Sequence, residues 1–190
     1  ITIKGNKKLY PIEIKISGDI SSAAFFMIAA LLTENSRVTL TNTGINPTRT
    51  GILKVLRNMG ANIELDNLCH YNLEPVADLT ITSRKLSGTT IGNPLIPQII
   101  DEIPVLAVAA TQARGETKIV DAGELRGKET DRIQAICLNL KAMGAKVEEL
   151  EDGLIIRGPT ELQGTEIETF GDHRIAMAFA VASLRATGPI

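Results

Sequence analysis

The densest group of charged side chains lies in one seven-residue run, Arg126-Gly127-Lys128-Glu129-Thr130-Asp131-Arg132. The run leads directly into an apolar pattern with helical spacing, which predicts that a helix begins here. Positive charge is unfavourable at the start of a helix, because the aligned peptide dipoles favour anions there. If Lys128 and Arg132 are both helical, they also lie four residues apart on one face and repel each other.

A second apolar helix pattern also begins with cationic or potentially cationic side chains, in the pair His173-Arg174. A small anion bound between the two helix starts would relieve both, since arginine offers forked donors to carboxylate or phosphate and the helix starts add backbone N–H groups. This pattern indicates a carboxylated or phosphorylated substrate. The alternative is a solvated first turn in which Glu129 and Asp131 neutralise the cations, and the charges alone leave both possibilities open.

Three aspartates each precede an alanine-rich helix pattern, at Asp19, Asp101 and Asp172. Capping of the helix is the simplest role, because aspartate accepts hydrogen bonds from the free N–H groups of the first turn. If the repeats lie about a pseudo-threefold axis, the three helix starts share one end of the domain. Asp101 and Glu129 are then carboxylates near a bound anion and several cations, and both are candidates for proton transfer.

An internal repeat predicts how these residues are positioned. The sequence Met-Gly-Ala ends an amphipathic helix twice, at Met59-Gly60-Ala61 and at Met143-Gly144-Ala145, and a short alternating strand follows each time, over 62–65 and 146–150. Glycine at this point is typical of a left-handed helix cap. The repeat is therefore a unit of structure, with a period of about 80 residues.

Each unit reads as strand, helix, strand, helix, strand, strand, which predicts an α/β domain. The alanine-rich helices are apolar nearly all round, so we expect them to be buried against each other with the sheets outside. The units are expected over about 10–86, 87–162 and, for a partial third, 163–190. The alanine-rich helices are expected at 21–33, 104–113 and 173–184, and the further strands at 38–40, 79–82, 118–120 and 154–157.

Composition excludes several classes of function. The chain has 190 residues, 44% of them hydrophobic, with a net charge of −2 and no basic run, so a nucleic-acid partner is not expected. Cys69 and Cys137 are far apart in sequence and indicate neither a disulfide framework nor a metal site. No apolar run is long enough for a membrane span and no signal peptide is visible, so we expect a cytoplasmic protein without a membrane partner. Phosphate-loop, dinucleotide-binding and serine-nucleophile motifs are absent from the sequence.

Five motifs together resemble the EPSP synthase family, and the resemblance extends from near the first residue to the last. In chain order they are Gly18-Asp19-Ile20-Ser21-Ser22-Ala23-Ala24-Phe25-Phe26, Asn46-Pro47-Thr48-Arg49-Thr50-Gly51, Ile100-Asp101-Glu102, Lys128-Glu129-Thr130-Asp131-Arg132-Ile133 and Gly171-Asp172-His173-Arg174-Ile175-Ala176-Met177. The last two distinguish the chain from the related UDP-N-acetylglucosamine enolpyruvyl transferases. Gly127 departs from the family, which usually has an apolar residue there.

The resemblance implies an inside-out α/β barrel domain of repeated βαβαββ units, with central buried helices and outer sheets. It also implies transfer of the enolpyruvyl group of phosphoenolpyruvate to the 5-hydroxyl of shikimate 3-phosphate, without a metal or organic cofactor. By resemblance, Asp101 and Lys128 contact shikimate 3-phosphate, and Asp101, Glu129 and Lys128 are the candidate catalytic residues. The resemblance assigns phosphoenolpyruvate binding to Arg132, Arg174 and His173.

The family has a second, similar domain, so this chain resembles a C-terminal domain whose N-terminal partner domain and extreme C-terminus are missing. The resemblance therefore implies that this chain carries half of an active site. Two alternatives stay open: another enolpyruvyl transferase, of the UDP-N-acetylglucosamine type, and a non-catalytic module that binds anions.

Overall fold

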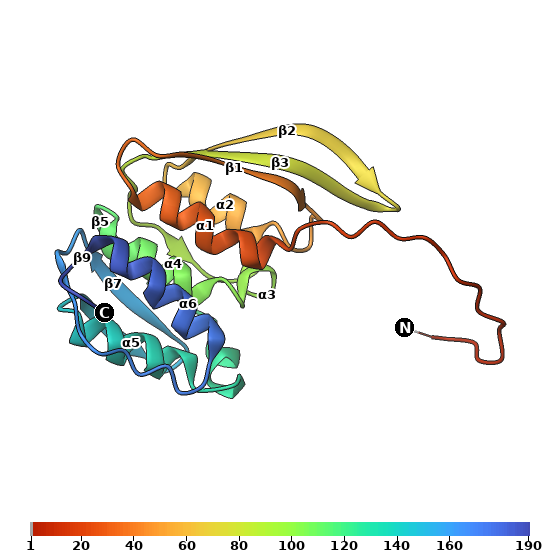
Figure 1. The fold of residues 1–190 in the computed structure, drawn as a ribbon. Helices are drawn as coiled ribbons and strands as arrows, with labels where there is room; N and C mark the ends of the chain where they lie inside the picture. The colour runs from red at the N-terminus through yellow and green to blue at the C-terminus, as the bar shows by residue number, and fades with distance from the viewer. Residues whose placement is uncertain (1) are drawn as a thin grey trace.

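One order of elements, helix, strand, helix, strand, strand, occurs twice in the structure, which is a computed structural model describing residues 2–190 (Figure 1). The first occurrence comprises α1 (Ile20–Leu32), β1 (Arg37–Gly44), α2 (Gly51–Asn58), β2 (Asn62–Tyr71) and β3 (Glu74–Thr82). The second comprises β4 (Thr90–Ile91), the short α3 (Ile96–Ile99), α4 (Ile103–Gln112), β5 (Gly115–Ile119), α5 (Arg132–Ala142), β6 (Lys146–Leu150) and β7 (Gly153–Gly158). The chain ends with β8 (Leu162–Gln163), α6 (His173–Ala182) and β9 (Ala186–Thr187), and 3-10 turns occur at Gly123–Gly127 and Ser183–Arg185.

The strands form separate sheets on the outside of the helices. The first sheet has the order β1-β3-β2 and is antiparallel, whereas the second has the order β4-β5-β7-β6 and begins with a parallel pair. That parallel pair, β4 and β5, is joined through the helix α4, as is usual for a crossover connection. The strands β8 and β9 form a second parallel pair joined through α6.

The unit order expected over about 10–86 begins with a strand, but residues 10–17 form no strand in the structure. Only an isolated parallel bridge between Gly18 and Thr43 stands in the equivalent position before α1. Residues 2–16 are exposed and belong to no strand, although the Lys15 carbonyl accepts a hydrogen bond from the Asn72 side chain at the turn between β2 and β3. The prediction was wrong for this element.

The three alanine-rich helices α1, α4 and α6 pack against one another in the centre of the molecule. In α4 every residue from Ile103 to Thr111 is buried, so this helix has no polar face that could be turned to water. Such a helix is stable only when neighbours cover all of its sides. The arrangement confirms the predicted fold class, with central buried helices and outer sheets.

The two Met-Gly-Ala turns end α2 and α5 in the same way. Gly60 and Gly144 have φ angles of +94° and +83°, a left-handed conformation that residues with a Cβ rarely adopt. In both turns the glycine N–H and the following alanine N–H donate to carbonyl groups of the last helical turn. The following strands, β2 and β6, are therefore placed equivalently, although β2 runs to Tyr71 and is longer than the predicted 62–65.

The central helices also end together. The last residues of α1, the segment after α4 and the turn after α6 border one hollow, which four cationic side chains line: Arg84, Lys85, Arg114 and Arg185. Because helix C-termini carry partial negative charge, cations are favourable there. The three helices thus run in parallel, and their beginnings share the opposite end of the domain.

Candidate functional site

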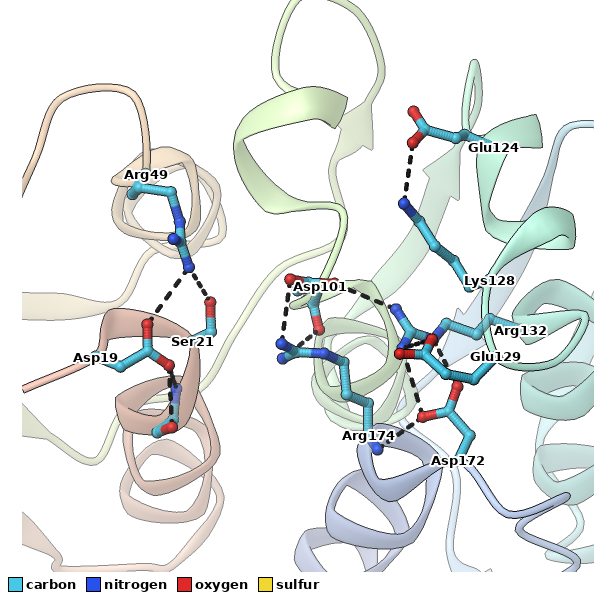
Figure 2. A network of polar contacts seen from close by, with 11 residues as sticks. Asp19, Ser21, Arg49, Asp101, Glu124, Lys128, Glu129, Arg132, Asp172 and Arg174 are labelled. Atoms are coloured by element: carbon cyan, nitrogen blue, oxygen red, sulfur yellow. Dashed lines mark hydrogen bonds and ion pairs between the residues drawn. The ribbon is translucent and has the colours of Figure 1, made fainter. Parts of the chain in front are cut away.

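The charged residues gather where the central helices begin (Figure 2). Arg174, in the first turn of α6, donates from Nη2 to the carboxylate of Asp101, just before α4, at 3.1 Å. At the start of α1, Arg49 donates to the Ser21 hydroxyl at 2.7 Å and pairs with Asp19 at 3.4 Å. The predicted common end of the three helices is confirmed.

Arg132 is the centre of the cluster and is 1% exposed. Its guanidinium donates to Asp172 at 2.7 Å, to Asp101 at 3.2 Å and to Glu129 at 2.6 Å. Burial alone would lower the pKa of Arg132, but the hydrogen bond and charge of Asp172, the charge of Glu129 and the hydrogen bond to Asp101 raise it. A buried guanidinium with three carboxylate partners is charged and fixed in position.

Asp172 has two functions in the structure. Its carboxylate accepts the backbone N–H of Arg174 at 2.8 Å and so caps α6, as predicted from the sequence. It also forms the buried ion pair with Arg132, which the sequence did not predict. Burial would raise the pKa of Asp172, but hydrogen bonds from Arg132 and from the N–H of Arg174 hold it below its ordinary value.

Asp101 does not cap α4, contrary to the simplest interpretation of the sequence. The residue at the cap position is Glu102, and its side chain makes no capping hydrogen bond. Asp101 lies one residue earlier, in a turn, where its two carboxylate oxygens accept separately from Arg132 and Arg174. Figure 2 shows Asp101 between the two arginines. The two ion pairs fix the orientation of the Asp101 carboxylate, because each of them uses one of its oxygens.

Lys128 and Arg132 do not share a helix face, because α5 begins only at Arg132, where Asp131 caps the helix. Lys128 follows the 3-10 turn in extended conformation and pairs with Glu124 at 2.9 Å. Glu129, which is half exposed, pairs with Arg132. Of the two acids predicted to neutralise these cations, Glu129 pairs with Arg132, but Asp131 pairs with Arg126 instead. The acid that pairs with Lys128 is Glu124.

His173 begins α6 beside these residues but is exposed, and it does not join the ion pairs around Arg132. The structure therefore brings together four of the candidate residues in one hydrogen-bonded network, namely Asp101, Glu129, Arg132 and Arg174. Lys128 extends from the same loop towards Glu124.

Arg126 holds the charged loop against the second sheet, a function that the sequence analysis missed. It donates to the carboxylates of Asp131 at 2.7 Å and Glu149 at 2.9 Å, and to the backbone carbonyls of Leu150 and Glu151. The sequence did not predict these contacts with β6 and the residue after it, because those residues are far from Arg126 along the chain. Arg126 thereby fixes the start of α5, and with it the position of Arg132.

Within residues 2–190 no group of three or more metal-binding side chains is placed to hold an ion. The same part of the chain has no helix that combines the length and the apolar character needed to cross a membrane.

Comparison with known proteins gives one consistent family. The family model for EPSP synthase (3-phosphoshikimate 1-carboxyvinyltransferase) matches residues 1–190. The chain is 54% identical over 188 residues to the 3-phosphoshikimate 1-carboxyvinyltransferase of Thermosynechococcus vestitus, and 48% identical over 190 residues to that of Bacillus cytotoxicus. The match covers 99% and 100% of this chain, but only 43% and 45% of the two relatives.

Solved structures agree with this assignment. An EPSP synthase from Acinetobacter baumannii superposes on the whole chain with a TM-score of 0.92 and 44% identity, and 46% of that protein is covered. The enolpyruvyl transferase NikO from Streptomyces tendae shares the fold, with a TM-score of 0.65 at 17% identity over 88% of this chain and 36% of its own. The chain thus spans less than half the length of these proteins. It belongs to the EPSP synthase (3-phosphoshikimate 1-carboxyvinyltransferase) family.

Proposed function

We propose that this chain supplies one half of an active site that transfers the carboxyvinyl group of phosphoenolpyruvate to the 5-hydroxyl of shikimate 3-phosphate. The observation that carries the proposal is the convergence of Asp101, Glu129, Arg132 and Arg174 at the start of the central helices. These helix starts favour anions, and the two arginines provide forked donors for a carboxylate or phosphate. Family membership supports the choice of substrates.

Binding of phosphoenolpyruvate would require an exchange of ion-pair partners. The guanidinium groups of Arg132 and Arg174 are occupied by the carboxylates of Asp101 and Glu129 in the unliganded chain. A substrate anion that takes these donors releases both acids from their cations. The exchange leaves Asp172 in place, because its pair with Arg132 is fully buried. Substrate binding thus converts two structural carboxylates into groups free to move protons.

The released carboxylates provide the proton-transfer groups that the proposed reaction requires. Addition of the 5-hydroxyl to the enol carbon forms a C–O bond, transfers the hydroxyl proton to a base and adds a proton to the methylene carbon. Asp101 is the candidate base and Glu129 the candidate for proton transfer at carbon, with Lys128 beside the hydroxyl. Elimination then breaks the C–O bond to phosphate, removes a methyl proton and restores the double bond. His173 is assigned to the phosphoenolpyruvate side of the site.

The remainder of the site would come from a further domain of a longer protein, since the relatives are about twice as long as this chain. The units over 10–86, 87–162 and 163–190 then form most of a C-terminal domain. The bound partners would be the two small-molecule substrates and that N-terminal domain, in the cytoplasm.

Release of inorganic phosphate from phosphoenolpyruvate and shikimate 3-phosphate tests the proposal, with the chain alone and after mixing with the N-terminal part of the longer protein. We expect no turnover by the chain alone and turnover by the mixture. Glu129→Ala should abolish this turnover, whereas Glu148→Ala, an exposed change on β6, should leave it unchanged. If the two parts are folded and associated but the mixture releases no phosphate, the proposal is contradicted. Turnover with UDP-N-acetylglucosamine in place of shikimate 3-phosphate would assign a different acceptor.

A further inference from the structure

Glu102 is a buried acid beside the proposed site. The residue is 3% exposed, and its Oε1 atom is buried without a hydrogen-bond partner in the described part of the chain. No cation within residues 2–190 lies at ion-pair distance from its carboxyl group, although Asp101 next to it has two. The side chain also does not cap α4, so neither common role of a glutamate at a helix start applies.

An ionised carboxylate in this position would be very unstable. Removal of an unpaired carboxylate from water costs so much free energy that such a group takes up a proton instead. Burial is the main reason that the pKa of Glu102 is raised, and the charge of neighbouring Asp101 raises it further. Ser21 from α1, Arg49 from the loop before α2 and Arg174 from α6 all act in the opposite direction without overcoming the burial.

We propose that Glu102 is a neutral, proton-bearing carboxylic acid at neutral pH, and that it is a positioning residue for the anion-binding end of the central helices. The network beside it contains three carboxylates, on Asp101, Glu129 and Asp172, and two guanidinium groups. A fourth negative charge beside this network would repel an incoming anion. The neutral acid fills the volume beside Asp101 without adding this charge.

The charge state can be tested on the chain itself by thermal unfolding of Glu102→Gln, which has nearly the same shape and is always neutral. In the unfolded wild type Glu102 ionises above its ordinary pKa of about 4.3, whereas in the folded chain it keeps its proton to higher pH. Wild-type stability therefore falls as pH rises through this window. We expect Glu102→Gln to raise Tm by about 3 °C or more at pH 8 and to leave it unchanged at pH 4.

Two further variants make the result decisive. Glu102→Met is neutral and apolar, and its Tm relative to wild type should also rise between pH 4 and pH 8. Any change in packing affects both pH values equally, so it does not alter this trend. Asp172→Asn is a matched control with the opposite sign, because that buried acid is ionised and paired. The Tm difference between Glu102→Gln and wild type is the quantity to compare at the two pH values. If the variant loses Tm relative to wild type between pH 4 and pH 8, Glu102 is ionised in the folded chain and the inference is overturned.

The effect on substrate binding rests on the proposed function. In the two-part enzyme, KM for phosphoenolpyruvate should rise more steeply with pH in the wild type than in Glu102→Gln on the alkaline side, because only the wild type gains a negative charge. Equal pH profiles of KM would overturn the positioning role. Failure of the mixture to turn over would reject the proposed function, and the unfolding measurements would still decide the charge state of Glu102.

Discussion

Replacement of Asp172 by asparagine should remove a large part of the stability of this chain. The side chain of Asp172 is completely buried and accepts from Arg132, which is itself 1% exposed. Removal of one partner of a buried ion pair typically costs about 3–5 kcal/mol. We expect the lower end, about 3 kcal/mol, because Arg132 keeps Glu129 and Asp101 and because asparagine caps a helix as well as aspartate does.

The loss should depend on pH in a defined direction. The pKa of Asp172 is held below its ordinary value in the folded chain, so its contribution to stability is complete above the unfolded pKa of about 3.9. The contribution disappears as pH falls through the folded pKa. For a domain of this size 3 kcal/mol corresponds to a decrease in Tm of about 6–12 °C at pH 7. Circular dichroism during heating, at pH 7 and at successively lower pH, measures both the size and the trend.

Asp19 provides a matched control, because it occupies the equivalent position before α1 and also caps its helix. Its side chain is half exposed and its contact with Arg49 is long, at 3.4 Å, so Asp19→Asn should cost less than about 1 kcal/mol. Similar losses for Asp19→Asn and Asp172→Asn, or a loss for Asp172→Asn that persists unchanged at low pH, would refute the reasoning from the buried pair.

Two smaller predictions concern single residues of the same chain. Gly127 and Gly144 both have free space for a Cβ, but only Gly144 has a positive φ. Gly127→Ala should therefore be neutral or stabilise the chain by up to about 1 kcal/mol, whereas Gly144→Ala should destabilise it by about 1–2 kcal/mol. Urea unfolding measures both changes. Cys137 is buried, and burial raises its pKa to about 11, while Cys69 is exposed. A thiol reagent at pH 8 should therefore modify one cysteine in the folded chain and two in urea; rapid modification of both in the folded chain would contradict the burial of Cys137.

The fold could be predicted largely from the sequence because its determinants are local and repeated. The Met-Gly-Ala turns at Gly60 and Gly144 fix a left-handed conformation that few other residues adopt. Helices apolar on all sides, such as α4, can only be central. The strand that the repeat order implies at the start of the first unit did not form, because a strand needs a neighbouring strand and a repeat in the sequence does not show whether one is present.

The site could be predicted as a set of residues but not as a set of pairs. The unfavourable position of Arg132 and Arg174 at helix starts indicated an anion site, since that signal is local. Asp101 was expected to cap α4 and instead joins two arginines that are distant in sequence. Glu102 gave no signal at all, because a glutamate beside an aspartate at a helix start is ordinary until its burial is known.

The parallel arrangement of α1, α4 and α6 gives the domain an electrical polarity that extends beyond its contacts. The helix starts present positive potential at one end, and the basic hollow lined by Arg84, Lys85, Arg114 and Arg185 offsets the negative potential of the helix ends at the other. Long-range fields of this kind guide charged ligands during diffusion, and salt weakens them over about 8–10 Å. Both ends of the helix axis therefore attract anions over this range, the helix starts through their dipoles and the hollow through its four cationic side chains.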